Sequence, residues 1–350
     1  MPRSPSSPDG ARCERDVSLN LSAVLGELSA RRRSRPDMTV ATMTVVAYFD
    51  DPAVGEWARD RVHALAVKHP SRAIVLDGTQ DAGVQHVPAE CAEHEDCVKT
   101  RGDWIELGVR GMDALLVESA VATLRLPEAP AVLLWVAPGA AGDPRFVALA
   151  RTMRTIVFNT SVLTFDDAAL RELVALQREG YKAAIADLAY LRLHPWQEAI
   201  AHFFDHPQHV EELYDIRRVE IVCGSDPEAY YLLGWLASRL EWLPTGPNTF
   251  RNALGVSIEF SIQREGVPRR IRRVEMHSSG TRFRAAIDDE RAEAIVITIE
   301  GAKTHPVRAR PINNIDLAAL VERAILSAHN DRIFTESLFA AGGVLERRKD

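Results

Sequence analysis

The stretch IADLAYLRLHPWQEAIAHFFD, from Ile185 to Asp205, lies near the middle of the chain and decides how the sequence divides. Pro195 suits the first turn of a helix, where its missing N–H is no loss, and it favours an extended conformation at His194. The sequence therefore predicts an extended segment over residues 190–192 and a helix that begins at Pro195. The apolar face of this helix repeats at helical spacing and consists of Trp196, Ala199, Ile200 and Phe203. We interpret the stretch as an anchoring element between a mostly parallel half and a mostly antiparallel half of the protein.

On the N-terminal side of this stretch, short apolar runs alternate with helical patterns. The expected strands are residues 42–49, 72–76, 104–109, 131–136 and 155–158, and the expected helices are residues 52–68, 112–124, 146–153 and 167–178. Strands that alternate with helices are typical of a parallel sheet covered on both faces. We therefore expect a Rossmann-like α/β domain over residues 37–165. Residues 1–36 are expected to form a disordered tail and a short amphipathic helix.

On the C-terminal side, the pattern changes to strands at meander spacing. A strand over residues 218–223 and a helix that ends at Trp242 come first, and strands follow at 255–262, 270–276, 282–287 and 294–299. This order predicts an α+β domain over residues 166–350 with an antiparallel sheet. Two amphipathic helices, 317–328 and 333–345, are expected to cover one face of that sheet. The residues expected to hold the two motif helices in the core are Trp196, Phe203, Trp235, Leu236, Leu240 and Trp242.

The charge balance argues against a general affinity for anions. The chain carries 42 basic and 49 acidic side chains, a formal net charge of −7, which gives no global attraction to nucleic acid or to an anionic membrane. No segment approaches the apolar length of a membrane span, so the cytoplasm is the expected location. The local cluster of Arg269, Arg270, Arg272 and Arg273 is interpreted as a solvated hairpin rather than an RNA site. Glu265 and Glu275 flank it, and no aromatic residue is interleaved for base stacking.

The spacing of the cysteines gives little indication of a metal site or of redox chemistry. Cys13, Cys91, Cys97 and Cys223 are too scattered for a disulfide framework. Cys91, His94 and Cys97 could offer three zinc ligands, but no fourth ligand follows at a recognisable spacing. We expect no metal site, and we expect Cys91 and Cys97 to be dispensable. Redox control through these two residues or Cys223 stays open.

A nucleotide motif is missing from the first half. There is no G-x-G-x-x-G after the first strand and no G-x-x-x-x-G-K-[ST] in the chain, so no cofactor is expected. The first strand ends instead in Asp50, Asp51 and Pro52, of which Asp51 is expected to cap the next helix. Residues 159–161, Asn-Thr-Ser, could hydrogen-bond a ligand at the carboxyl edge of the sheet, although a plain turn is the commoner outcome.

Two blocks, IADLAYLRLHPWQEAIAHFFD at 185–205 and DPEAYYLLGWLASRLEW at 226–242, resemble the OpcA family, the glucose-6-phosphate dehydrogenase assembly proteins, in their order and separation. Weaker landmarks are HPSRAIVL, CVKTRGDWIEL and LPEAPAVLLWV. The resemblance covers nearly everything from Val17 onward. It implies a two-domain α/β protein without catalysis of its own that binds glucose-6-phosphate dehydrogenase and promotes its active oligomer. Family members usually carry Asn-Trp where this chain has Ala189-Tyr190, so the chain resembles a divergent member.

Tyr190, Arg192 and His194 are the candidate partner-binding residues. In an extended segment Tyr190 and Arg192 would point to the same side, and both residue types are enriched at binding hot spots. The alternative is that Arg192 pairs with a nearby acid such as Asp187. A second class of function also stays open, namely a sugar-phosphate binding enzyme or a sensor of carbohydrate metabolism. It would use residues 159–161 with Arg154, Arg192 or His194.

Overall fold

The computed structural model describes residues 21–34, 41–85, 103–163, 166–266, 270–288, 294–301, 305–311, 317–327 and 331–348. The strands are β1 (Met43–Phe49), β2 (Ser71–Asp81), β3 (Gly83–Gln85), β4 (Asp103–Arg110), β5 (Ala131–Trp135), β6 (Thr155–Phe158), β7 (Ala184–Asp187), β8 (Arg218–Cys223), β9 (Leu243–Gly246), β10 (Thr249–Arg251), β11 (Ser257–Arg264), β12 (Ile271–His277), β13 (Thr281–Ile287), β14 (Ala294–Gly301) and β15 (His305–Pro311). The helices are α1 (Leu21–Ser34), α2 (Pro52–Lys68), α3 (Ala114–Leu124), α4 (Pro144–Ala150), α5 (Thr160–Leu163), α6 (Ala168–Glu179), α7 (Leu188–Leu191), α8 (His194–Ala201), α9 (Pro207–Val210), α10 (Asp226–Leu240), α11 (Leu317–Ser327) and α12 (Arg332–Arg347), with short 3₁₀ turns η1 (Ala140–Gly142), η2 (His202–Phe204) and η3 (Glu211–Asp215). Residues 1–20, which contain the expected tail, lie outside the described residues, as do Cys91, His94, Cys97 and Arg269.

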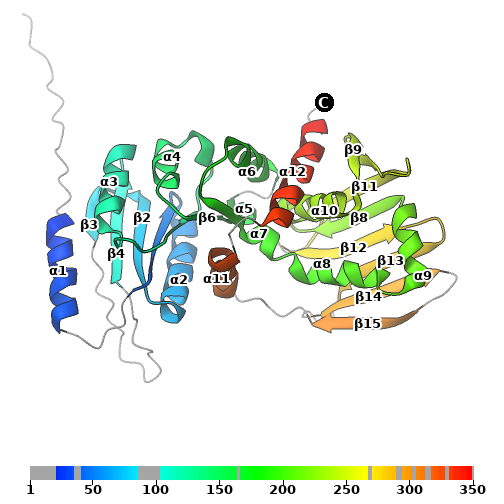
Figure 1. Cartoon of the computed structure of the whole chain (residues 1–350), viewed down its shortest axis with the longest axis horizontal. Coiled ribbons are helices and arrows are strands. Elements are labelled where there is room, and N and C mark those ends of the chain that lie inside the picture. Colours follow the sequence, from blue (N-terminus) through cyan, green and yellow to red (C-terminus); the bar gives the residue numbers. More distant parts are fainter. Residues whose placement is uncertain are drawn as a thin grey trace, which may run out of the picture.

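The first sheet has seven strands in the order β3-β4-β2-β1-β5-β6-β7. All neighbours are parallel except β3 and β4, which are antiparallel. Figure 1 shows α3, α4 and α6 along one face of this sheet and α2 with α11 along the other. Because both faces are covered, the strands are almost continuously apolar, and residues 45–49 of β1 are all buried. The predicted parallel α/β architecture is confirmed.

The second sheet has eight strands in the order β15-β14-β13-β12-β8-β11-β10-β9. β8 and β11 are parallel, and every other neighbouring pair is antiparallel. Its apolar face rests on α8 and α10 (Figure 1), and Phe203 of the η2 turn packs on Phe283 of β13 at a ring-centroid distance of 5.5 Å. The predicted α/β fold with a second, mostly antiparallel sheet and C-terminal helices is therefore confirmed.

The central stretch differs from its predicted conformation. Residues 188–191 form the helical turn α7 instead of an extended segment, and α8 begins at His194 rather than Pro195. The reason is a cap: the carboxylate of Asp187 accepts a hydrogen bond from the backbone N–H of Ala189 at 2.9 Å, which starts a helix before the proline is reached. Tyr190 and Arg192 therefore do not share one side, because two residues differ by about 200° around a helix.

The end of the first sheet and the position of helix α11 also differ from what the sequence pattern predicted. The first sheet continues past residue 165, where the first domain was expected to end, because β7 pairs with β6 as far as Asp187. Helix α11 packs on α2, α7 and β6 rather than on the second sheet. A hydrogen bond of 2.8 Å between His69 Nε2 and Glu322 Oε1 joins α11 to the residue after α2.

Helix α10 lies between the second sheet and α12, which explains why nearly all of it is buried. Gly234 lets the two helices approach closely, since a Cβ atom there would lie 2.1 Å from the carbonyl oxygen of Ser337. The motif residues Trp196, Phe203, Leu236 and Trp242 are buried, whereas Trp235 and Leu240 are partly buried. Within the described ranges, no helix combines the length and the apolar character that a membrane crossing requires.

Candidate functional site

A buried polar network joins the two sheets at the carboxyl ends of β6 and β7. Asp187, at the end of β7, is 1% exposed. Its Oδ1 atom accepts hydrogen bonds from the backbone N–H groups of Thr160 (3.2 Å) and Ala189 (2.9 Å). Its Oδ2 atom accepts hydrogen bonds from the hydroxyls of Thr160 (2.6 Å) and Tyr231 (2.8 Å). One carboxylate thus ties β6, β7 and α10 together.

Glu228, one turn before Tyr231 on α10, forms the second half of the network. Its Oε1 atom accepts hydrogen bonds from the hydroxyl of Ser161 at 2.6 Å and from Arg192 Nη2 at 3.0 Å. Its Oε2 atom accepts a hydrogen bond from the hydroxyl of Ser225, the residue before α10, at 2.6 Å. Arg192 Nη2 also donates to Asn159 Oδ1 at 3.1 Å. Arg192 therefore pairs with Glu228 and not with Asp187.

Burial dominates the electrostatics of this network. Loss of solvent raises the pKa of Asp187, although four donated hydrogen bonds oppose the shift. Burial, together with the nearby Asp187 carboxylate, raises the pKa of Tyr231 well above its usual value. Hydrogen bonds in such a low-dielectric interior are strong, and an unpaired group there is costly. Because the carboxylate oxygens of Asp187 and Glu228 already accept hydrogen bonds, we interpret the network as a structural connection between the sheets, the buried lock, rather than as a set of reactive groups.

A cavity of about 400 Å³ opens on the other side of α7. Its walls come from α7, α8, α10, α11 and the start of α12, and they include Tyr190, His194, Gln197, Trp235, Arg323 and Asp331. Among the described residues, the buried Nε2 atom of Gln197 makes no hydrogen bond of ordinary geometry. The cavity thus combines two aromatic walls with amide, acidic and basic groups.

The structure separates the three candidate partner-binding residues. Tyr190 and His194 both line the cavity, whereas Arg192 points into the buried network. Tyr190 is only 6% exposed, and its ring packs edge-on against Tyr231 and Phe334. The side chain of His194 is 43% exposed, which makes it the most accessible of the three. Sequence reasoning named Asp187 only as a possible partner of Arg192 and missed Tyr231, although an aspartate directly before a helical turn is a recognisable cap signal.

The carboxyl edge of β1 and β5 holds a second group of polar residues. Tyr48 stacks on Trp135 with ring centroids 4.1 Å apart, and the guanidinium of Arg145 lies 5.0 Å above the Tyr48 ring. Arg145 donates to both oxygens of Asp143, the cap of α4. Burial raises the pKa of Tyr48 to about 12, and it also raises the pKa of Asp50. A cavity of about 540 Å³ lies alongside, between the first turns of α3 and α4.

This edge does not fit the phosphates of a dinucleotide. The Asp51 carboxylate accepts a hydrogen bond from the backbone N–H of Ala53 at 2.8 Å, so the predicted cap of α2 is confirmed and an anion already occupies the helix end. At Gly78 on β2, an added Cβ atom would lie 2.9 Å from the Phe49 carbonyl oxygen, which leaves little space between the ends of β1 and β2. Asp50 and Asp51 would repel a pyrophosphate.

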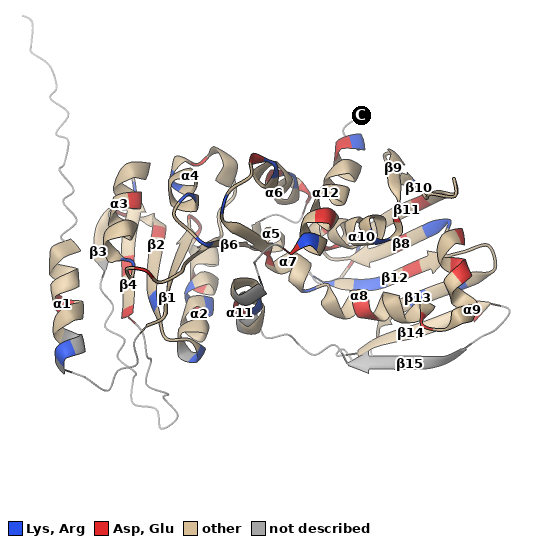
Figure 2. Cartoon of the chain, in the orientation of Figure 1, with Lys and Arg blue, Asp and Glu red and all other residues tan. Residues whose placement is uncertain are grey.

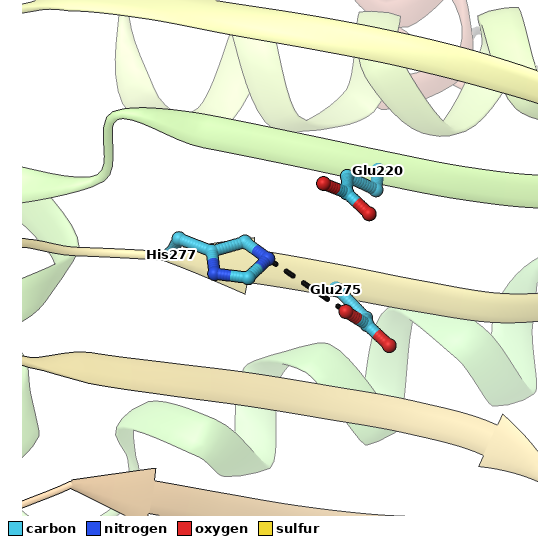
Figure 3. Close-up of side chains that lie close together, drawn as sticks. All are labelled: Glu220, Glu275 and His277. Atoms are coloured by element: carbon cyan, nitrogen blue, oxygen red, sulfur yellow. Dashed lines mark ion pairs between the residues drawn. The ribbon is translucent and has the colours of Figure 1, made fainter.

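A third cluster lies on the second sheet. Glu220 on β8 and Glu275 and His277 on β12 place potential ligand atoms within 4.8 Å of one another (Figure 3). Glu275 is already surrounded by Arg273, Arg282 and Arg284, at nitrogen-to-oxygen distances of 3.3, 2.7 and 3.4 Å. A divalent cation would have to displace these guanidiniums or stand beside them, and repulsion opposes both. This chemistry argues against a metal ion.

The two sheets and the lock between them define an α/β protein of Rossmann-like architecture in which, among the described residues, the end of β1 forms no phosphate cradle. Residues 62–177 match the glucose-6-phosphate dehydrogenase subunit N-terminal domain, and residues 183–338 match the C-terminal domain of the same subunit. The chain belongs to this family, the OpcA family.

Similar proteins agree with this assignment. The chain is 31% identical over 187 residues to the putative OxPP cycle protein OpcA of Synechocystis sp., which covers 51% of this chain and 39% of the relative. It is 30% identical over 187 residues to the protein of the same name from Nostoc punctiforme, covering 51% of this chain and 40% of the relative. The matched region is therefore about half of this chain and less than half of each relative.

Solved structures show the same architecture at low sequence identity. The 3-ketoreductase KijD10 from Actinomadura kijaniata, in its open conformation with NADP, superposes with a TM-score of 0.52 at 14% identity, over 88% of this chain and 96% of that chain. A second structure of that enzyme gives a TM-score of 0.50 at 14% identity, over 88% and 97%. At this identity the likeness shows the fold alone.

Proposed function

We propose that this chain is a non-enzymatic subunit that binds glucose-6-phosphate dehydrogenase and promotes its active oligomer in the oxidative pentose phosphate pathway. The observation that carries the proposal is the succession of two domain matches, residues 62–177 and 183–338, both described as parts of a glucose-6-phosphate dehydrogenase subunit. A cytoplasmic location follows from this role and belongs to the same proposal.

The geometry supports a binding role over catalysis. The carboxyl edge of the first sheet, where open α/β sheets hold their ligands, carries a capped helix and repelling carboxylates at the end of β1. The carboxylates of Asp187 and Glu228 are engaged by donors in the buried lock. Both features are consistent with a scaffold that functions through its surface rather than through an interior site.

The contact is proposed to include the mouth of the cavity beside α7. His194, 43% exposed, and Ile333, 45% exposed, stand at this mouth on α8 and α12. Tyr190 and Arg192 would then stabilise the contact residues indirectly. The ring of Tyr190 packs on Phe334, and Arg192 forms an ion pair with Glu228. An apolar residue beside an exposed imidazole is a suitable centre for a protein contact.

The test mixes the purified chain with the dehydrogenase of its own organism and follows NADPH formation and the mass of the complex. We expect a faster dehydrogenase or a larger complex, and a weaker effect with His194→Ala. His63→Ala, an exposed histidine on α2, is the matched control. If the wild-type chain changes neither the rate nor the mass, the proposal fails.

The cavity beside α7 favours one second candidate, a sensor of carbohydrate metabolism. Tyr190 and Trp235 provide aromatic walls on which a sugar ring can stack, and Arg323 provides a cation. Thermal melting and tryptophan fluorescence with sugar phosphates would detect such a ligand, with inorganic phosphate as the control. A signal that Trp235→Phe abolishes would support the sensor, and no shift with any sugar phosphate would exclude it for those ligands.

A further inference from the structure

The face of the second sheet opposite α8 and α10 carries ordered rows of charged side chains. Strand pairing aligns residues of β11, β8, β12, β13 and β14 in two such rows: Ser261, Glu220, Glu275, Arg284 and Thr298 form the first, and Glu259, Arg218, His277, Arg282 and Glu300 form the second. Apolar residues such as Val219, Met276 and Phe283 alternate with them and point to the covered face. Figure 2 shows basic and acidic positions next to each other along β12.

At the centre of this face the two acids are less exposed than the arginines, whereas Glu259 and Glu300 at its edges are exposed. The side chain of Glu275 is 3% exposed and that of Glu220 is 25% exposed. By contrast, the side chains of Arg218, Arg282 and Arg284 are 57, 44 and 42% exposed. Long arginine stems cover the carboxylates while their guanidiniums reach solvent. The exposed centre of the face is therefore basic, even though the chain as a whole has a net charge of −7.

The donors of this cluster also outnumber its acceptors. Arg282 donates twice to Glu275 Oε2, at 3.1 and 2.7 Å, which occupies that oxygen. The Nε atoms of Arg273 and Arg284 are buried beneath the guanidinium groups, 3.3 and 3.4 Å from Oε1, and within the described part of the chain neither Nε makes a hydrogen bond. Arg218 pairs with Glu220 at 2.7 Å, and Arg282 also lies 3.5 Å from Glu300 at the edge of the face. Four guanidiniums thus surround two inner carboxylates, and the exposed parts of these arginines can donate to an external acceptor.

We propose that this arginine face, Arg218, Arg273, Arg282 and Arg284 above Glu220 and Glu275, is a docking surface for an acidic patch on the dehydrogenase. The inference rests on the function proposed above and adds where the partner binds and by which chemistry. Carboxylates on the partner would accept hydrogen bonds from the exposed guanidiniums, and opposite potentials would steer the encounter.

Other occupants fit less well. A second copy stacked on the same centre would place like charges opposite one another, because the row Glu259, Arg218, His277, Arg282, Glu300 has nearly the same charge sequence in both directions. Nucleic acid would need aromatic residues for base stacking. Both aromatic residues of these five strands, Phe260 and Phe283, are buried on the opposite face.

The experiment compares affinities for the dehydrogenase at low and high salt. Arg218→Gln with Arg284→Gln removes two exposed charges while Arg282 still pairs with Glu275, so the fold should survive, as thermal melting will verify. Arg218→Lys with Arg284→Lys keeps the charge. Arg178→Gln is the matched control, since Arg178 is 52% exposed and pairs with Glu346 on another part of the molecule.

We expect about tenfold weaker binding and a shallower salt dependence for the double glutamine variant, because rim charges control association rate and salt response. The lysine pair should keep most of the affinity, and Arg178→Gln should bind as wild type. Wild-type affinity in a folded double glutamine variant would overturn the docking surface and leave the proposed function standing. A wild-type chain that never binds the dehydrogenase would overturn both. Sedimentation and RNA binding complete the test: a dimer, or an RNA complex, that the glutamine pair abolishes would reassign the face and overturn the inference.

Discussion

Substituting Gly234 by alanine sets two opposing effects against each other. Alanine is about 1 kcal/mol better than glycine in a helix interior, so an isolated α10 would gain stability. In the folded protein the new Cβ atom would lie 2.1 Å from the Ser337 carbonyl oxygen and 2.9 Å from the backbone nitrogen of Ala341. Ordinary contacts begin near 3.4 Å, and both neighbours are backbone atoms that cannot rotate away.

The steric effect should win. Helices α10 and α12 would have to separate by about 1 Å, which loosens a close-packed interface. Overpacking of this kind costs about 1–3 kcal/mol and occasionally more, and a backbone clash belongs at the upper end. Subtracting the gain in helix propensity leaves a net destabilisation of about 2 kcal/mol, or a fall in melting temperature of about 3 °C for a chain of this size.

Two other glycines provide the controls in the same assay, thermal and urea unfolding followed by circular dichroism. Gly26→Ala on α1 meets no atom within 4 Å and should leave stability unchanged or slightly higher. Gly342→Ala on α12 meets the side chain of Val174 at 2.9 Å, which can shift, so its cost should be intermediate. A Gly234→Ala protein that melts at or above the wild-type temperature would refute the close approach of α10 and α12.

Further predictions concern the buried lock and the thiol of β8. Asp187→Ala should lower the free energy of unfolding by about 2–4 kcal/mol, because it leaves the buried N–H groups of Thr160 and Ala189 without an acceptor. Asp187→Asn should lower it less, since its side-chain carbonyl can still accept hydrogen bonds from both groups. Urea unfolding would compare the two variants, and equal losses of stability would contradict the network. Burial raises the pKa of Asp187, so the folded state favours the protonated acid, and that stabilising contribution is complete below the unfolded pKa of about 3.9 and is lost as the pH rises through the higher folded pKa. Wild-type stability relative to Asp187→Asn should therefore fall as the pH is raised above about 4, and a pH-independent difference would argue against the raised pKa. Cys223 is buried, and burial raises the pKa of its thiol to about 12, so alkylating reagents should label it only after unfolding, as mass spectrometry can show; rapid labelling of the folded protein would contradict its burial.

The sequence by itself determined most of the element types, because their signals act over a few residues. The continuous apolar runs predicted the strands of the first sheet, and the alternation of strands and helices predicted its parallel order, which the pairing of β1 with β2 and β5 confirms. Asp51 before Pro52 predicted a helix cap that the structure contains. The two blocks at 185–205 and 226–242 also carried the family resemblance, which the domain matches confirm.

Tertiary structure decided where those elements meet. Because Asp187 caps it, the segment that was predicted to be extended forms helix α7. The Asp187 carboxylate also accepts hydrogen bonds from Thr160 and Tyr231, which lie 27 and 44 residues away in the chain. Helix α11 packs beside the first sheet, where it contacts α2, an element more than 200 residues earlier in the chain. The arginine face likewise depends on the register of β8, β12 and β13, which sets which charges stand side by side. Periodicity and caps are local properties of a sequence, whereas burial of a carboxylate and strand register depend on packing between segments that are distant in the chain.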